Sequence, residues 1–472
     1  MKAWKNGDPA APSFPESFEL LKKAVLQVTD IKTNRNKYYA IELHQAAGSF
    51  RVFTHYGRTD DLETNPDAGA KESRFFLDGL EATACYEQIF REKTSPKKGY
   101  KEVSLASSKI GSQKARGASV GEVDAKTVAK IAEGNKDKPP PKVSSLPPDI
   151  QELVSYIYAE ATNALTSTVA AKITANGIET PLGVLTIGQI ERGEVILQDL
   201  YRLFQASSRN RSEMERLSGE FYTCVPHRIG RTRSAIAEAV IDSMEDFQQK
   251  QETLQLMKDM LSVDGDASGG SVLFDSKVDA QYEALRCELA PIEKKNPIYR
   301  EMEELILRSQ IKTKTIAVRN IYTVMRSDEW EAYDGKIGNE RLLLHGSRIK
   351  NWVGLLSRGI LLPKIVVSMG VNRTDAGWLG NGIYFGDAAC TSAFYTTAGK
   401  KGTRFMAVAR VALGKMREYT KITYGLNEPP PGYDSCHGVR HTPKTPSQFA
   451  DDEYVVYRTN RQRIEALVEF TN

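Results

Sequence analysis

The chain has 472 residues, of which 40% are hydrophobic and 26% charged, and its formal net charge is +4. This length exceeds that of one ordinary domain, so two to four compact units are expected. No apolar run reaches the ~18 residues that cross a bilayer, and the segment after Met1 lacks the apolar core of a secretion signal. We therefore expect a soluble, intracellular protein that does not span a membrane.

The cysteines argue against a disulfide framework and against structural zinc. All five are widely spaced and none forms a CxxC pair: Cys85, Cys224, Cys287, Cys390 and Cys436. Only Cys436 lies near histidines, His437 and His441, and three ligands are too few for a structural zinc site. We expect reduced thiols and no bound metal.

The N-terminal quarter is predicted to be β-rich. Residues 1–16 have the composition of a loose tail, and the runs 24–28, 37–43 and 50–54 mix alternation with β-branched or aromatic residues, which is typical of strands. The last run leads into Tyr56-Gly57-Arg58. Residues 70–91 have apolar positions at helical spacing, which predicts a helix behind a small sheet.

Positive charge is concentrated in the first third of the chain. Residues 1–142 contain 24 Lys and Arg against 19 Asp and Glu, and residues 91–116 contain eight basic residues against two acidic ones. A basic strip with a nearby aromatic such as Tyr100 can neutralise phosphates and stack on a base or sugar. A solvated surface loop is an equally good interpretation of the same charges.

The same region carries a family resemblance. A strand that ends in an aromatic-Gly-Arg triplet and is followed by a helix and Lys97-Lys98-Gly99-Tyr100 resembles the WGR domain of the DNA-dependent poly(ADP-ribose) polymerases. Tyr56 stands where that domain has its name-giving tryptophan, which keeps a flat ring of smaller area. The resemblance implies a DNA-binding domain at residues 17–124, with contacts from Asn36, Tyr56, Gly57, Arg58, Lys97, Lys98 and Tyr100.

The middle of the chain is predicted to be a linker followed by a helical bundle. Residues 125–145 are charged and proline-rich, as in a linker. Residues 146–265 show helical spacing, with a capping-box pattern from Thr186 to Gln189. We interpret His227 as a helix-packing histidine. The bundle resembles the regulatory domain that precedes the catalytic domain in the same family.

Residues 271–472 alternate strand-like and helix-like runs, which predicts a mixed α+β sheet. Strands are expected at 315–326, 342–344, 404–413 and 464–470, and helices at 350–358 and 387–398. The strand at 342–344 would deliver His345 at its end, and a glycine turn leads into Tyr384. Ser392 and Tyr395, three residues apart on a helix, share one face.

These side chains suit a flat ligand that carries an amide and a ribose, such as NAD. Gly346 and Ser392 can bind the carboxamide, Tyr384 and Tyr395 supply ring faces, and the ribose would lie at His345 and Ser347. Glu453 begins another strand-like run. An ionised carboxylate there can stabilise the oxocarbenium-like centre that forms when nicotinamide leaves the ribose, and can polarise an acceptor hydroxyl. We interpret the neighbouring Asp451 and Asp452 as a solvated turn.

In their contexts, His345, Tyr384 and Glu453 resemble the H-Y-E signature of the family's ADP-ribosyltransferase domain, and Ser392 and Tyr395 resemble its nicotinamide-pocket residues. Thr391 stands where the family leads one to expect a lysine, and Leu361 where it leads one to expect an arginine. The glutamate implies polymer formation.

The resemblance implies a multidomain α+β protein: a small β-rich WGR-like domain, an α-helical bundle and a mixed α+β ADP-ribosyltransferase domain. It further implies a monomeric poly(ADP-ribose) polymerase that uses NAD as substrate without a metal, and that binds DNA strand breaks. The helical domain would inhibit it at rest, and its acceptors would be proteins, including itself. The compartment would be the nucleus, or the cytoplasm in a bacterium. The alternatives are a non-enzymatic DNA-binding scaffold and a mono-ADP-ribosyltransferase.

Overall fold

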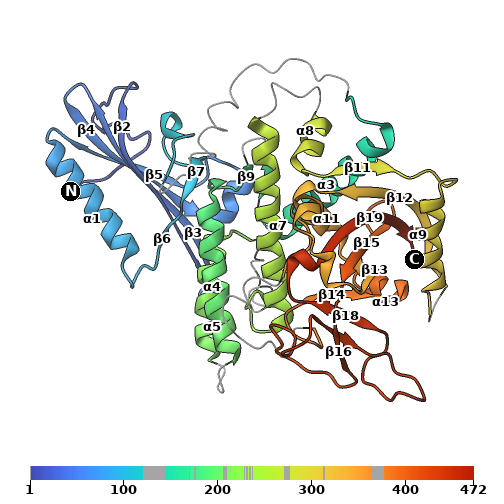
Figure 1. The fold of residues 1–472 in the computed structure, drawn as a ribbon. Coiled ribbons are helices and arrows are strands. Elements are labelled where there is room, and N and C mark those ends of the chain that lie inside the picture. The colour runs from blue at the N-terminus through green and yellow to red at the C-terminus, as the bar shows by residue number, and fades with distance from the viewer. Residues whose placement is uncertain are drawn as a thin grey trace. The chain divides into compact units, whose positions relative to one another are not determined.

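The computed structural model describes residues 2–472, except 121–143, 170, 175–176, 206–209, 228, 230–231, 233–234, 236–237, 270–276, 312–313 and 363–376. The expected linker therefore lies largely outside the described residues. The chain divides into two compact units, Met1–Pro139 with Leu165–Ser268, and Pro140–Ala164 with Gly269–Asn472. The multidomain α+β class is confirmed (Figure 1).

The first unit contains a six-stranded antiparallel sheet in the order β1-β5-β4-β3-β2-β6. Its strands are β1 (Trp4–Lys5), β2 (Glu19–Asp30), β3 (Arg35–Ala46), β4 (Ser49–Arg58), β5 (Ala70–Phe76) and β6 (Lys101–Glu102). Helix α1 (Gly79–Thr94) packs its buried Ala82 and Tyr86 against one face of this sheet. The three predicted strands are confirmed.

The helix predicted behind the sheet is confirmed as α1, but its predicted start at residue 70 was wrong. Residues 70–76 form strand β5, and α1 begins only after Asp78, whose carboxylate accepts hydrogen bonds from the first amides of the helix. Leu80, one of the apolar positions at helical spacing, is 82% exposed and does not pack against the sheet. The expected loose tail is also partly structured, because β1 pairs with β5 and the Phe14 ring packs against Phe75.

A second, four-stranded sheet lies in the same unit, in the order β7-β10-β9-β8. It combines β7 (Leu105–Ser108) with β8 (Lys172–Thr174), β9 (Gly177–Glu179) and β10 (Gly183–Leu185). The helices that follow this sheet in the chain are α4 (Ile187–Gln205), α5 (Arg211–Cys224) and α7 (Met244–Gly269). Helix α5 contacts β2 closely: the Thr29 amide donates to the Thr223 hydroxyl at 2.9 Å, and a Cβ on Gly219 would lie 2.6 Å from the Thr29 carbonyl oxygen.

The second unit is built on a nine-stranded sheet in the order β11-β12-β19-β15-β13-β14-β18-β17-β16, antiparallel except for β16 and β17. Its strands are β11 (Glu288–Pro291), β12 (Ala317–Met325), β13 (Glu340–Gly346), β14 (Ile383–Gly386), β15 (Arg404–Ala412), β16 (Met416–Tyr419), β17 (Ser435–Gly438), β18 (Glu453–Val456) and β19 (Gln462–Thr471). Its helices are α3 (Pro148–Thr168), α8 (Lys277–Ala284), α9 (Pro297–Arg308), α10 (Ser327–Ala332), α11 (Trp352–Arg358) and α13 (Ala389–Phe394).

Adjacent residues of the central strand β15 pack against different helices, as the two-residue repeat of a strand requires. Met406 belongs to a buried cluster with Tyr299 of α9 and Ala393 of α13. Phe405 instead contacts Trp352 of α11 and Tyr156 of α3. Helix α3 spans the division between the units, because its first seventeen residues belong to the second unit.

In the parts of the chain that the structure describes, no helix combines sufficient length with sufficient apolar character to cross a bilayer.

Candidate active site and nucleic-acid-binding face

Strand β13 places His345 and Gly346 at its end, where His345 pairs with Ala407 of β15. The Nδ1 of His345 lies 2.9 Å from the backbone carbonyl oxygen of Tyr384, and because a carbonyl can only accept, Nδ1 carries the proton. Burial lowers the pKa of His345, although the carbonyl contact opposes this shift. The ring is therefore neutral near pH 7, with Nε2 as a hydrogen-bond acceptor.

Gly346 lies directly against α13. A Cβ built on Gly346 would be 1.8 Å from the carbonyl oxygen of Ser392, a distance at which no side chain fits. Ser392 itself is buried on α13, and its Oγ would lie 3.5 Å from a Cβ at Gly386. The two residues expected to bind a carboxamide are thus adjacent in space, although 46 positions separate them in the sequence.

Replacing Gly346 by Ala is expected to destabilise the second unit by about 1–3 kcal/mol or more, because the added methyl group overlaps the Ser392 backbone. Calorimetric melting of the full chain measures this change. Gly188→Ala is the matched control, since the nearest atom to its Cβ is the Thr186 hydroxyl at 4.0 Å. Equal melting temperatures for both variants would contradict the close contact.

Tyr384 lies on β14, and its hydroxyl is already used within the protein. The hydroxyl donates to the Gly380 carbonyl at 2.7 Å and accepts from the Leu379 amide at 2.9 Å. These bonds fix the ring and hold the glycine turn before β14. What Tyr384 can offer a ligand is therefore the face of its ring.

Glu453 is the first residue of β18, where it pairs with Gly386 of β14 and Gly438 of β17. Gly386 also pairs with Leu344 of β13, so the strands that carry His345, Tyr384 and Glu453 are neighbours. Burial, and then the negative charge of Asp451, raise the pKa of Glu453 to about 7.

The Glu453 charge also reaches the two aromatic residues of the candidate site. Burial raises the pKa of Tyr384 and of Tyr395, and the charge of Glu453 adds to both shifts. Tyr395 follows α13 and is 60% exposed, with its ring against Phe394. The Ser347 hydroxyl accepts a hydrogen bond from Asn351 at 3.2 Å.

Sequence reasoning missed the role of Asp451. This residue is 6% exposed and accepts a hydrogen bond from the Thr391 hydroxyl. The bond ties the segment before Glu453 to α13, which carries Ser392. The prediction of a solvated turn at Asp451 was therefore wrong, and the presence of Thr391 instead of an expected lysine was the available signal.

Arg440 holds three carboxylates beside the start of β18. Its guanidinium donates to Asp387 at 2.7 Å, and lies 3.5 Å from Asp452 and 3.7 Å from Asp451. Asp452 also contacts His437 Nε2 at 2.7 Å. Burial favours the protonated form of Asp452, but the bonds from His437 and Arg440 outweigh it and lower the pKa. Asp452 is thus an ion-paired residue.

Leu361, one of the two departures from the family pattern, follows α11 and lies next to the segment 363–376, which is outside the described residues.

Within the described ranges, no group of three His, Cys, Asp or Glu side chains is arranged to hold a metal ion.

The first unit has a cavity of about 420 Å³ at the end of β4. Tyr56 stacks on Tyr39 with centroids 5.0 Å apart, and the Lys93 ammonium lies 4.5 Å above the Tyr39 ring. The residues that line the cavity are Lys37, Tyr39, Tyr56, Gly57, Arg58, Glu72, Arg74, Lys93 and Tyr100. Tyr100 is only 8% exposed, so it contributes to the wall and has little free ring surface.

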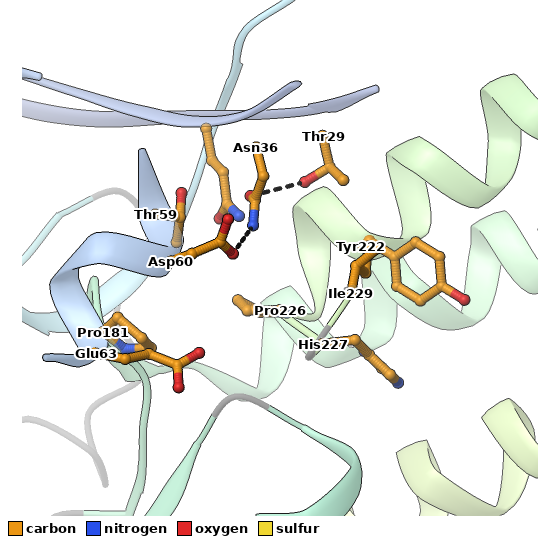
Figure 2. Close-up of a pocket in the computed structure, with 11 residues that line it drawn as sticks. Thr29, Asn36, Thr59, Asp60, Glu63, Pro181, Tyr222, Pro226, His227 and Ile229 are labelled. Atoms are coloured by element: carbon orange, nitrogen blue, oxygen red, sulfur yellow. Dashed lines mark hydrogen bonds between the residues drawn. The ribbon is translucent and has the colours of Figure 1, made fainter. Parts of the chain in front are cut away.

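Asn36 lines a different, smaller pocket (Figure 2). Its side-chain amide donates to Asp60 at 2.7 Å, and its carbonyl oxygen lies 3.4 Å from the Thr29 hydroxyl. His227 lines the same pocket, and its Nδ1 donates to the Val225 carbonyl at 2.7 Å. Burial lowers the pKa of His227 to about 3, which agrees with a packing role.

The predicted basic strip is not one continuous surface. Lys109 pairs with Glu179 at 2.6 Å, Arg116 pairs with Asp67, and the Lys114 ammonium donates to the Glu16 carbonyl at 3.4 Å. Lys97 and Lys98 lie on the turn after α1 and do not line the cavity. Lys93, Lys37, Arg58 and Arg74 supply the positive charge at the cavity instead.

Three family models match consecutive parts of the chain. They are the WGR domain at residues 22–107, the poly(ADP-ribose) polymerase regulatory domain at 144–265 and the poly(ADP-ribose) polymerase catalytic domain at 298–472. The chain belongs to the poly(ADP-ribose) polymerase family. The H-Y-E residues and the Gly346–Ser392 contact all lie in the part that matches the polymerase catalytic domain, and the cavity at Tyr56 lies in the part that matches the WGR domain.

Curated relatives in the polymerase family carry different names. The chain is 33% identical over 327 residues to protein mono-ADP-ribosyltransferase PARP4 of Mus musculus, which covers 69% of this chain and 16% of the relative. It is 27% identical to poly [ADP-ribose] polymerase 2-A of Oryza sativa subsp. japonica, covering 94% of this chain and 65% of the relative. It is 25% identical to protein mono-ADP-ribosyltransferase PARP3 of Homo sapiens, covering 94% of this chain and 86% of the relative. The chain thus spans only 16% of the mouse protein's length.

Proposed function

We propose that this chain transfers ADP-ribose from NAD to protein acceptors, including itself, releases nicotinamide and extends the product into a polymer. The observation that carries the proposal is the strand order β13-β14-β18, in which Gly386 of β14 pairs with Glu453 on one side and with Leu344, the neighbour of His345, on the other. We further propose that DNA ends start the reaction and that residues 165–268 inhibit it at rest.

The residues of the site have separable roles in binding NAD. The backbone of Gly346 and the hydroxyl of Ser392 would hold the carboxamide, because the two residues are in contact. Tyr384 and Tyr395 would present ring faces to nicotinamide. The unprotonated Nε2 of His345 can accept a hydrogen bond from a ribose hydroxyl.

Glu453 would carry the chemical step. The bond between nicotinamide and ribose C1′ breaks, nicotinamide leaves with the bonding electron pair, and positive charge develops on the ribose. An ionised carboxylate nearby stabilises that charge in a partly buried site, where electrostatic interactions are strong. The acceptor then forms a bond to C1′ and loses its proton, towards Glu453 when the acceptor is a hydroxyl.

This role predicts the pH dependence of the reaction. Only ionised Glu453 is active, and its pKa is raised to about 7, so kcat should fall as pH decreases through 7. Asp451→Asn removes the neighbouring negative charge and should lower the pKa of Glu453, which moves the acidic limb to lower pH. A pH profile of nicotinamide release measures this, and an unmoved limb in the variant would contradict it.

The cavity at Tyr56 supports DNA binding, because it combines aromatic rings with four cationic side chains. Replacing Tyr56 and Arg58 together by Ala should reduce DNA stimulation about tenfold or more, since each base-stacking contact contributes about 1–3 kcal/mol. Basal turnover should not change. Lys114→Ala is the control, as its ammonium is bonded to Glu16 and Ser17 away from the cavity.

Nicotinamide release from NAD by the purified chain, with and without nicked DNA, tests the proposal. We expect release that rises when DNA is added. No release under either condition would favour the non-enzymatic scaffold, and release without a DNA effect would refute only the DNA-activation part.

A single transfer is the second candidate, because the mouse and human relatives are named mono-ADP-ribosyltransferases. Labelled NAD distinguishes the two products on a denaturing gel. A ladder of slowly migrating species indicates polymer, whereas one sharp labelled band at the size of the chain indicates single transfer.

A further inference from the structure

Helix α3 makes hydrogen bonds to the rest of the second unit over much of its length. Before the helix, the Ser144 hydroxyl donates to Asp279 at 2.5 Å. Within it, the Tyr158 hydroxyl donates to the Gln281 carbonyl of α8 at 2.9 Å, and Glu160 accepts from the Lys400 amide at 2.8 Å. The division between the two units falls inside α3, after Ala164. These contacts place residues 144–164 within the fold of the second unit.

Tyr156 occupies the centre of this contact, on the turn 399–403 between α13 and β15. Its ring is buried, and its hydroxyl accepts from the Lys401 amide at 3.3 Å and from the Thr403 hydroxyl at 3.4 Å. The Lys401 ammonium lies 4.8 Å above the same ring and also pairs with Glu152. The turn is therefore fixed by an aromatic ring, two hydrogen bonds and an ion pair from one helix.

Tyr156 and Ile349 meet at the same point of the turn. A Cβ on Gly399 would lie 2.2 Å from the Tyr156 hydroxyl and 2.5 Å from Ile349 Cδ1, so only glycine allows this approach. Ile349 in turn donates its amide to the Thr397 hydroxyl at 3.3 Å. The turn thus connects the segment after Arg348 with the segment after Tyr395.

These two segments directly follow the residues of the proposed nicotinamide site. One follows His345 to Ser347, and the other follows Ser392 and Tyr395. A group that fixes the turn between them also fixes the distance between the two walls. Loss of such a group costs binding free energy, because NAD must then order the two walls when it binds.

We propose that Tyr156 of α3 is a positioning residue for the NAD site, and that residues 144–164 are a fixed support of the catalytic unit although they belong to the matched regulatory region. The inference rests on the proposed NAD-dependent activity. It differs from a role for α3 as an inhibitor, in which loosening its contacts would increase activity.

The test compares full-length variants in nicotinamide release with nicked DNA at varied NAD concentration. Tyr156→Phe keeps the ring and loses both hydrogen bonds, so KM for NAD should rise about 2- to 10-fold, as for the loss of 0.5–1.5 kcal/mol. Tyr156→Ala also removes the ring and should raise KM further. In both variants kcat should change less than KM. Tyr282→Phe is the matched control, because its hydroxyl accepts from the Leu289 amide at 3.1 Å and the residue lies outside 144–164.

The possible results separate this inference from the proposed function. An unchanged KM in Tyr156→Phe, or a KM increase of the same size in Tyr282→Phe, would overturn the positioning role while leaving the enzyme intact. Higher DNA-independent release in either Tyr156 variant would overturn it in favour of an inhibitory α3. If Tyr156→Ala does not fold in a calorimetric melt, Tyr156→Phe decides the question. Absence of release by the unmodified chain would refute the proposed function itself.

Discussion

Replacing Glu453 by Gln is expected to abolish polymer growth and to lower nicotinamide release by about 10²–10³-fold, the usual loss when one transition-state stabilising group is removed. Glutamine keeps the size of the side chain but has no charge to oppose the developing positive ribose. Its amide oxygen can accept a hydrogen bond from an acceptor hydroxyl but is too weak a base to take its proton. Slow single transfer or hydrolysis can remain, since the substitution leaves the proposed NAD contacts at Gly346 and Ser392 in place. Release kinetics and a labelled gel measure both effects.

Glu418→Gln is the matched control for this substitution. Glu418 lies on β16 of the same sheet, and its side chain is 70% exposed. It should retain full release and a full ladder. A Glu453→Gln variant that still forms long polymer would exclude the carboxylate from chain growth. An equal loss of nicotinamide release in Glu418→Gln would indicate a general effect of removing a negative charge from the sheet.

Removing residues 165–268 and joining the ends by a flexible linker is expected to raise DNA-independent release by about 5- to 150-fold. This range corresponds to a coupling free energy of about 1–3 kcal/mol between regulatory and catalytic parts. The deletion leaves the second unit whole, because that unit consists of Pro140–Ala164 and Gly269–Asn472. Nicotinamide release without DNA is the measurement, and an unchanged rate would count against inhibition by these helices.

A deletion of residues 146–263 provides the comparison. It removes α3 together with the other helices, and thus removes Tyr156 from the turn at 399–403. If α3 is a support, this longer deletion should be less active than the shorter one. If both deletion variants release nicotinamide at the same raised rate without DNA, α3 has no supporting role.

Much of the catalytic fold could be predicted from local sequence patterns. The strands at 342–344, 404–413 and 464–470 correspond to β13, β15 and β19, because buried runs bounded by turn residues are a local signal. The adjacency of Gly346 and Ser392 could only be expected from the chemistry of the ligand. The close contact itself, in which Gly346 has no room for a Cβ, is visible only in the three-dimensional structure.

Features that depend on distant partners were not predictable in this way. Residues 70–91 show apolar spacing that fits a helix, but pairing with β4 makes residues 70–76 a strand. Asp451 has the composition of a solvated turn, and its burial follows from Thr391, sixty positions away. Asn36 was expected at a DNA face, and its hydrogen bond to Asp60 places it in another pocket. Local periodicity contains no information about such partners.

The central claim is that an imidazole, a phenol ring and a carboxylate from three neighbouring strands surround the ribose next to nicotinamide. A crystal structure of the full chain with a non-hydrolysable NAD analogue measures this directly. We predict the Glu453 carboxylate at about 2.6–3.2 Å from the 2′-hydroxyl of that ribose, with the carboxamide on Gly346. An analogue bound elsewhere, or bound there with the Glu453 carboxylate out of reach of the ribose, would contradict the account.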